Sequence, residues 1–343
     1  MSYPPPIMVS YAVTRACNLR CPHCYSDAVN EPSPLELSTE EAKELIDDIA
    51  DMGTRLIIFD GGEPTLRPDL PELISHAADA GLSPLLGTNG MVDTMTYNYA
   101  VELREAGIKA IAVSVDSYIP EEHDLFRGKE GGWERTMRGI ENIRRAGIPF
   151  QIGFTLRKGM VERIEGMVEL AKRVGAIALE IFEFIPAGRG NEHKQYELTM
   201  SERAQAVKKI IEIQRREDLI IRVIGCPQYW VEVERTVPEL ERMKFIRSCC
   251  GAGTRYATIL YDGTVYPCML LPIPLGNVRS KPFSKIWGES EVLRDLRDTS
   301  KLKGACANCP YADICVGARC RAYAKTGDYL AEDPGCWIRG ELL

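Results

Sequence analysis

The chain has 343 residues, of which 45% are hydrophobic and 27% charged, and a formal net charge of −7. These fractions are typical of a soluble globular protein with one large or two medium domains. The acidic balance argues against nucleic acid as the main partner, because phosphate binding needs a concentrated basic surface. No apolar run reaches the roughly 20 residues that span a bilayer, and the N-terminus lacks the basic and apolar regions of a secretion signal. We therefore expect a cytoplasmic protein with no membrane partner.

Short β-rich runs alternate with amphipathic helical patterns from about residue 7 to residue 217. The strand candidates are 7–13, 55–59, 83–87, 109–115, 149–155 and 177–184. The helix candidates lie near 38–52, 69–81, 93–106, 132–146, 160–174 and 199–216. In the first helix, Ser38 can cap the amide of Glu41, whose side chain can return the bond. Six β/α units in succession predict an α/β fold, a partial (βα)6 TIM-like barrel, over residues 1–217.

Residues suited to chemistry follow the predicted strands, where parallel α/β folds bind their ligands. Cys17, Cys21 and Cys24 follow the first strand, and the run Asp60-Gly61-Gly62-Glu63-Pro64 follows the second. The later positions are Thr88-Asn89-Gly90 after the third strand, and Ser114, Asp116 and Phe126-Arg127-Gly128 at and after the fourth. Gln151, Thr155 and Glu183 are candidates for side chains that face the barrel lumen from strands five and six.

The first three cysteines have the spacing C-x3-C-x2-C and are followed by the aromatic residue Tyr25. A [4Fe–4S] cluster is usually held by four cysteines, so three on one compact loop can leave one iron open. An open iron can chelate a small molecule and pass it an electron. A zinc knuckle is the alternative, but it needs a fourth ligand. His23 would be strained in that role, because it adjoins Cys24.

This cysteine motif, followed by Gly-Gly-Glu-Pro, resembles the radical S-adenosylmethionine (SAM) enzymes. The resemblance implies that the open iron binds the amino and carboxylate groups of SAM, whose reductive cleavage yields methionine and a 5′-deoxyadenosyl radical. It implies that Tyr25 lies along the adenine and that the motif Gly61, Gly62, Glu63 and Pro64 contacts the amino group. It implies contacts to the ribose and carboxylate from Asn89, Ser114, Asp116 and Arg127. The resemblance also implies a ferredoxin or flavodoxin as electron donor.

Nine of the twelve cysteines lie from residue 226 onward, and without an export signal they indicate metal ligands rather than disulfides. Residues 258–268 predict a hairpin with an Asp262-Gly263 turn. The cysteine spacing from residue 250 to residue 336 resembles the SPASM extension of radical SAM proteins. It departs once, because four residues rather than three separate Cys315 from Cys320. We therefore expect a linker and a small cysteine-rich SPASM domain with irregular cluster-binding loops over residues 218–343.

The SPASM resemblance implies two auxiliary clusters, and thus three [4Fe–4S] clusters in all. One auxiliary cluster would take Cys268, Cys320 and one or both of Cys249 and Cys250. The other would take Cys306, Cys309, Cys315 and Cys336. Cys226 is either a buried thiol or a replacement for one of the adjacent pair. A zinc ribbon is the alternative for this half of the chain.

The resemblance implies an oxidoreductase that modifies its substrate oxidatively, and two substrate classes compete. One is a tetrapyrrole whose side chains undergo oxidative decarboxylation in heme-type biosynthesis. Residues 267–278 and 320–336 resemble such enzymes, although the second stretch also occurs in several peptide maturases and so discriminates poorly. The other is a ribosomal peptide or a protein that receives a thioether or carbon–carbon crosslink. Met269 stands where formylglycine-forming members carry an acid, which argues against that chemistry.

The sequence leaves the catalytic base unassigned. Arg157, Arg189 and Arg255 are candidates to hold substrate carboxylates. A third interpretation of the cysteines is a non-enzymatic iron–sulfur electron carrier, although such a protein has no need of a SAM pocket.

Overall fold

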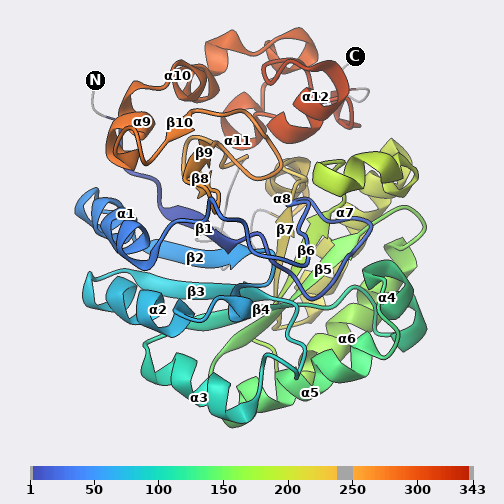
Figure 1. The fold of residues 1–343 in the computed structure, drawn as a ribbon. Helices are drawn as coiled ribbons and strands as arrows, with labels where there is room; N and C mark the ends of the chain where they lie inside the picture. Colours follow the sequence, from blue (N-terminus) through green and yellow to red (C-terminus); the bar gives the residue numbers. More distant parts are fainter. Residues whose placement is uncertain (1–2, 238–249, 340–343) are drawn as a thin grey trace.

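The computed structural model describes residues 3–237 and 250–339, so the predicted ligand Cys249 lies outside the described residues. One ten-stranded sheet forms its centre, with the order β10-β9-β8-β1-β2-β3-β4-β5-β6-β7 (Figure 1). The strands are β1 (Met8–Thr14), β2 (Leu56–Gly61), β3 (Ser83–Thr88), β4 (Ala110–Ser114), β5 (Phe150–Leu156), β6 (Ala178–Glu183), β7 (Ile220–Ile224), β8 (Tyr256–Ile259), β9 (Thr264–Tyr266) and β10 (Gly276–Asn277). Strands β8 and β1 to β7 are parallel, whereas β9 and β10 pair antiparallel.

The six predicted strands are confirmed as β1 to β6, and they form the parallel core of the expected partial barrel. Strand β7 was not predicted and pairs in parallel with β6. It begins shortly after residue 217, so the sheet continues past the expected end of the barrel domain. The domain boundary itself stays a prediction.

The helices alternate with the strands, and α1 to α3, α5 and α6 lie along the outside of the curved sheet (Figure 1). They are α1 (Thr39–Asp51), α2 (Leu70–Asp79), α3 (Tyr97–Glu105), α4 (Pro120–Arg127), α5 (Gly132–Arg145), α6 (Ile164–Val174), α7 (Met200–Arg216), α8 (Gln228–Thr236), α9 (Phe283–Glu289), α10 (Glu291–Arg297), α11 (Ala312–Cys315) and α12 (Arg319–Thr326). The predicted capping box of Ser38 and Glu41 is present at α1. The six predicted helices are confirmed, and α4 and α8 to α12 were not predicted.

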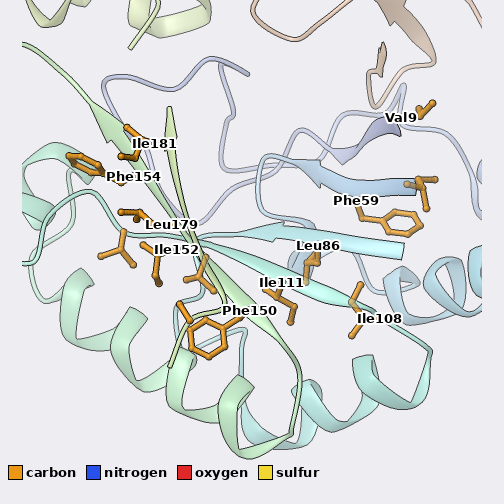
Figure 2. Packing of buried hydrophobic residues seen from close by; sticks show 14 of the residues in the cluster. Val9, Phe59, Leu86, Ile108, Ile111, Phe150, Ile152, Phe154, Leu179 and Ile181 are labelled. Carbon is orange, nitrogen blue, oxygen red and sulfur yellow. The ribbon is translucent and has the colours of Figure 1, made fainter. Parts of the chain in front are cut away.

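The core lies between the strands and the covering helices. In β5, every second side chain is buried, and Phe150, Ile152 and Phe154 point toward the helices together with Leu179 and Ile181 of β6 (Figure 2). This period-2 pattern places the intervening β5 residues on the opposite face of the sheet, which lines the lumen. Among the described helices, none is long and apolar enough to cross a membrane.

The C-terminal half joins the barrel through its predicted hairpin, which is confirmed as β8 and β9. Gly263 closes the turn with a φ of +84°, a conformation that favours glycine. Strand β8 pairs in parallel with β1, so the hairpin extends the barrel sheet at the edge beside the cysteine loop. Helices α9 to α12 follow the hairpin and gather on the same side of the molecule (Figure 1).

Candidate active site

The loop after β1 brings Cys17, Cys21 and Cys24 into one packed group, with Leu19 of the same loop. The Leu19 amide donates to Cys17 Sγ over 3.4 Å, and Cys24 Sγ lies 3.3 Å from Ser26 Oγ. Burial raises the pKa of the Cys17 thiol to about 12 and also raises that of Cys21. These thiols are therefore poor nucleophiles by themselves, and a bound metal is what would deprotonate them. Three soft donors on one loop fit a cluster with an open iron.

Arg189 holds the cysteine loop from the opposite side of the barrel. Its Nε donates to the Cys21 carbonyl over 2.9 Å and its Nη1 to the Ala28 carbonyl over 3.0 Å, while its own amide donates to the Cys24 carbonyl over 3.0 Å. Arg189 was a candidate for binding a substrate carboxylate, but in the structure its guanidinium donates hydrogen bonds to backbone carbonyls of the cysteine loop. Arginine can satisfy several carbonyls at once because its five donors form a rigid fork.

The Gly61-Gly62 pair lets the end of β2 approach the cysteine loop. A Cβ on Gly61 would stand 2.5 Å from the Thr14 carbonyl, and a Cβ on Gly62 would overlap the Ala16 carbonyl. The Gly62 and Glu63 amides donate to these two carbonyls. The glycines are thus required for contact between two chain segments, whether or not a ligand also approaches them. Pro64 follows as the first residue of a short 3-10 helix and is buried.

Glu63 is fully buried and ties the ends of β2 and β3 together. One carboxylate oxygen accepts from the Thr65 and Thr88 hydroxyls over 2.6 and 2.7 Å, and the other from the Asn89 amide over 2.8 Å. Burial raises the pKa of Glu63, and these hydrogen bonds oppose that rise. Asn89 in turn donates to Asn18 Oδ1 in the cysteine loop over 2.7 Å. The predicted SAM contacts Glu63 and Asn89 therefore shape the loop.

Arg127 and Asp116 form a buried ion pair beside the cysteine loop. Arg127 Nε donates to Asp116 Oδ2 over 2.8 Å, and Asp116 Oδ1 accepts the Thr155 amide over 2.8 Å. Burial alone would favour the neutral acid, but the Arg127 guanidinium holds the pKa of Asp116 well below its usual range. Arg127 also interacts electrostatically with the sulfur atoms of Cys17 and Cys21, so its guanidinium lies near them. Ser114, the remaining candidate here, ends β4.

His23 is engaged away from the thiols. Its ring stacks on Phe126 at a centroid distance of 3.8 Å, and Nδ1 donates to the Phe126 carbonyl over 3.1 Å. Burial lowers the pKa of His23 to about 3, so the ring is neutral. The Arg157 guanidinium lies 3.7 Å from the centre of the Phe126 ring.

A cavity of about 260 Å³ lies between the cysteine loop and the β8–β9 hairpin. Tyr25 and Ser26 line it on the loop side, and Ser26 contacts Cys24 as described above. Tyr266 and Met269 line it on the hairpin side, where Met269 directly follows Cys268. The cavity lining therefore includes neighbours of a predicted ligand of the first cluster, Cys24, and of a predicted auxiliary ligand, Cys268.

Two groups of cysteines lie on the hairpin side. Cys250, Cys268 and Cys320 pack in one hydrophobic cluster, and burial raises the pKa of Cys268 to about 12. Cys306, Cys309, Cys315 and Cys336 line a single small cavity of about 40 Å³. Their grouping matches the two predicted ligand sets, apart from Cys249. Among the described residues, no three His, Cys, Asp or Glu side chains form a group that could hold a single metal ion.

Backbone amides already point at the second group of thiols. The Gly317 amide donates to Cys315 Sγ over 3.3 Å, and the Asp333 amide to Cys306 Sγ over 3.5 Å. Amide donors to cluster sulfurs are one way in which proteins tune iron–sulfur sites, so this set fits a cluster. Cys226 is 4% exposed and packs in the main hydrophobic core, next to Gln228.

A buried network of charged side chains joins the barrel to the cysteine-rich half. Most of its residues were not predicted from the sequence. Arg321 donates to both oxygens of Asp333 over 2.7 and 2.8 Å and to Glu183 over 2.7 Å. Arg203 of α7 also donates to Glu183 and reaches the Gly335 carbonyl over 3.0 Å. Glu183 was expected in the lumen, but these partners place it at the contact with the C-terminal half. The adjacency of Arg321 to Cys320 was the only sequence signal.

Three thiols at the carboxyl end of β1, together with two further cysteine groups in the C-terminal half, are the arrangement of a barrel enzyme that depends on iron–sulfur clusters. The sequence matches the radical SAM superfamily over residues 11–171 and the iron–sulfur cluster-binding SPASM domain over residues 249–310. The chain is similar over nearly its whole length to AdoMet-dependent heme synthases, AdoMet being SAM. It is 38% identical to the protein of Methanosarcina barkeri, covering 97% of both chains. It is 35% identical to that of Nitratidesulfovibrio vulgaris, covering 96% of this chain and 91% of the relative.

A peptide-modifying relative and a solved structure complete the comparison. The PqqA peptide cyclase of Xanthomonas axonopodis is 29% identical, with 97% of this chain and 88% of the relative covered. The structure of anSMEcpe with bound AdoMet and Cp18Cys peptide has a TM-score of 0.74 at 19% identity, covering 98% of this chain and 95% of that one, and so shares its fold. The chain belongs to the radical SAM superfamily, in the group with a SPASM domain. It is an enzyme that uses SAM and iron–sulfur clusters, rather than a non-enzymatic electron carrier.

Proposed function

We propose that this enzyme converts propionate side chains of a tetrapyrrole to vinyl groups by oxidative decarboxylation. The observation that carries the proposal is the 38% identity to an AdoMet-dependent heme synthase over 97% of both chains. The conversion removes one hydrogen atom, one electron and carbon dioxide from each propionate. It therefore needs a hydrogen acceptor and an electron acceptor on either side of the substrate.

The cavity supports this division of roles, because Ser26 at one wall contacts Cys24 and Met269 at the other directly follows Cys268. When bound, SAM and its cluster supply the radical that takes the hydrogen atom, and an auxiliary cluster can accept the electron. The chain's own residues orient the reactants. In this proposal Arg127 pairs with the SAM carboxylate, which is supported by the use of only its Nε by Asp116 among the described residues. Tyr25 lines the cavity where the adenine edge is expected.

The proposal includes three [4Fe–4S] clusters. Cys17, Cys21 and Cys24 hold the first, and the two cysteine groups of the SPASM half hold the auxiliary clusters, with Cys249 completing the set of Cys250, Cys268 and Cys320. A ferredoxin or flavodoxin in the cytoplasm supplies the reducing electron. All of these assignments rest on family resemblance and on the grouping of the thiols.

Modification of a peptide is the second candidate function, and the similarity to PqqA peptide cyclases favours it. The cavity carries no carboxylate among the described residues that line it, since Met269 occupies the position after the hairpin cysteine. A crosslinking reaction that needs a base at this position is therefore less well served than a decarboxylation.

Anaerobic reconstitution followed by a product assay tests the function. The reduced enzyme is incubated with SAM and with or without iron-coproporphyrin III, and the products are separated and weighed by mass spectrometry. We expect 5′-deoxyadenosine formation to rise with the porphyrin, whose mass falls by one carboxyl group and one hydrogen per converted side chain. An untouched porphyrin, with slow formation of 5′-deoxyadenosine, would contradict the proposal. The Cys17→Ala/Cys21→Ala/Cys24→Ala variant is the control, and it should lose SAM cleavage and keep auxiliary iron.

A further inference from the structure

We infer that Arg15 binds a carboxylate of the substrate at the wall of the cavity between the cysteine loop and the β8–β9 hairpin. The inference rests on the proposed function and specifies how the substrate is recognised. Arg15 follows β1 directly and is the one charged residue among the described residues that line this cavity. A carboxylate that enters the cavity meets no other cation among the described residues of its wall.

The Arg15 guanidinium is available for a ligand. Its Nη2 lies 3.7 Å from Asp27 Oδ2, which is longer than a hydrogen bond, and the side chain is 36% exposed. Asp27 is shared, because its other oxygen accepts a hydrogen bond from Arg189 Nη1 over 3.1 Å. No hydrogen bond joins the Arg15 guanidinium to any other described residue. Its parallel donors can therefore grip a carboxylate in the two-pronged geometry that arginine favours.

The backbone of Arg15 is fixed on both sides, so the side chain starts from a defined position. The Arg15 amide donates to Glu36 Oε1 over 2.9 Å, and the Arg15 carbonyl accepts the Val29 amide over 3.1 Å. Glu36 is occupied by this bond and by bonds from the Thr14 hydroxyl and the Ser33 amide. The Oε1 atom of Glu36 is thus used by the loop. Because the backbone is already fixed, ligand binding has to order only the side chain.

The rest of the cavity wall suits a flat, largely apolar ring. On the hairpin side, Tyr261, Tyr266 and Met269 contribute aromatic faces and a flexible thioether. A volume of about 260 Å³ admits one edge of a tetrapyrrole rather than the whole macrocycle. We expect the edge that enters to carry a propionate that pairs with Arg15, while a neighbouring side chain reaches the reacting centre. Arg15 would then select substrates that bear acidic side chains on adjacent rings.

Binding measurements without reductant test this inference separately from turnover. Reconstituted wild-type, Arg15→Gln, Arg15→Lys and Arg138→Gln proteins are titrated with iron-coproporphyrin III and with its tetramethyl ester, followed by the porphyrin absorbance. Arg138 is an exposed arginine on α5, remote from the cavity lining, and is the matched control. We expect Arg15→Gln to weaken binding of the free acid about 10- to 100-fold, Arg15→Lys to recover part of it, and Arg138→Gln to change nothing. Binding of the ester should be the same in all four proteins.

Iron content and SAM binding are measured alongside, and both should stay at wild-type values in the Arg15 variants. Equal loss for acid and ester would show that Arg15 shapes the site instead of pairing with a carboxylate, and unchanged binding of the acid by Arg15→Gln would overturn the inference as well. In both cases the proposed function would stand, because the wild type still binds the porphyrin. If the wild type binds neither compound, the proposed function fails and the inference falls with it.

Discussion

The loop that carries Cys17, Cys21 and Cys24 takes its shape from residues elsewhere in the chain. Arg189 holds its carbonyls, Asn89 holds Asn18, and the end of β2 packs against it through Gly62. Contacts within the polypeptide therefore hold the backbone of this loop, as rigid scaffolds usually do around a metal site.

Replacing Gly62 with alanine should disturb the cysteine loop, because the new Cβ would overlap the Ala16 carbonyl. Overpacking of this kind costs about 1–3 kcal/mol of unfolding free energy, and we expect the first cluster to be lost in part. Chemical unfolding and iron analysis measure both effects. Gly288→Ala is the matched control, since Gly288 lies in α9 with open space around it and alanine there should stabilise by up to about 1 kcal/mol. A stable Gly62→Ala protein with full iron would contradict the prediction.

His123 should make the protein sensitive to mild acid. This residue of α4 is 1% exposed, and its Nδ1 accepts the Asp116 amide over 3.2 Å, so the ring is bound in its neutral form. Burial, and then the Arg127 charge, lower the pKa of His123 from 6.5 to about 4. Between those values the unfolded chain takes up the proton and the folded protein does not. Stability is therefore lost as the pH falls through this window, by about 2 kcal/mol between about pH 7.5 and about pH 5.

Urea unfolding of wild type and His123→Gln at the two pH values measures this contribution. The amide of glutamine can still accept the Asp116 bond, so the variant should fold and lose about 2 kcal/mol less than wild type on acidification. His76→Gln is the control, because His76 lies near the surface of α2 beside Asp47. An identical acid response of wild type and His123→Gln would refute the assignment.

At the scale of elements, strands β1 to β6 were predictable because local patterns determine them. Each is a short apolar run followed by an amphipathic helix, and the chemistry-bearing residues follow the strands as parallel folds require. Strand β8 was also expected as half of a hairpin. Its pairing with β1 was not, because that contact joins Met8 and Tyr256 and leaves no local mark in the sequence. The missed helices α9 to α12 are mostly short, and a helix of about two turns has too few periods for its apolar pattern to be distinct.

Asp333 should be essential to the contact between the barrel and the SPASM half. Its carboxylate accepts from Arg321, from Gln228 Nε2 over 2.7 Å, and from the Ala318 amide over 2.8 Å. Burial favours the neutral acid, but the Arg321 charge holds the pKa of Asp333 well below its usual range. In Asp333→Asn, Glu183 is the remaining carboxylate partner of the buried Arg203 and Arg321 among the described residues. Breaking a buried ion pair in this way costs about 3–5 kcal/mol.

Unfolding free energies and iron content distinguish a local from a global effect of Asp333→Asn. We expect a loss of stability with reduced auxiliary iron, while the iron of the first cluster is retained. Asp79→Asn is the matched control, because Asp79 is exposed at the end of α2 and its loss should change stability by less than about 0.5 kcal/mol. Wild-type stability of Asp333→Asn would show that the network is replaceable.

At the scale of the whole molecule, the candidate site was only partly predictable. The cysteines and the Gly-Gly-Glu-Pro run can be recognised from residue type and spacing. The structure groups the described cysteines as that spacing predicts. Arg15 and Arg189 carry no such mark. Arg189 acts on backbone carbonyls, which any sequence supplies, and Arg15 matters because a hairpin more than 200 residues later closes a cavity around it. Residues of this kind are found only when the chain is folded.

The placement of the cavity between two cysteine groups predicts that SAM cleavage and substrate oxidation can be separated. Cys320 packs with Cys250 and Cys268 on the hairpin side, remote from the loop that would bind SAM. We expect Cys320→Ala to lose up to about four irons per chain and the oxidised product, and to keep formation of 5′-deoxyadenosine. Iron analysis and the product assay measure these quantities in the same reconstituted sample.

Cys226→Ala is the matched control for Cys320→Ala, and it also decides the role of Cys226. Because Cys226 is buried in the main core beside Gln228, its replacement should remove a little packing and leave iron content and product unchanged. Loss of about four irons in Cys226→Ala would instead make that thiol a cluster ligand. Full product formation by Cys320→Ala would contradict the role of the hairpin-side cluster as electron acceptor, because the electron released with carbon dioxide would then have another destination.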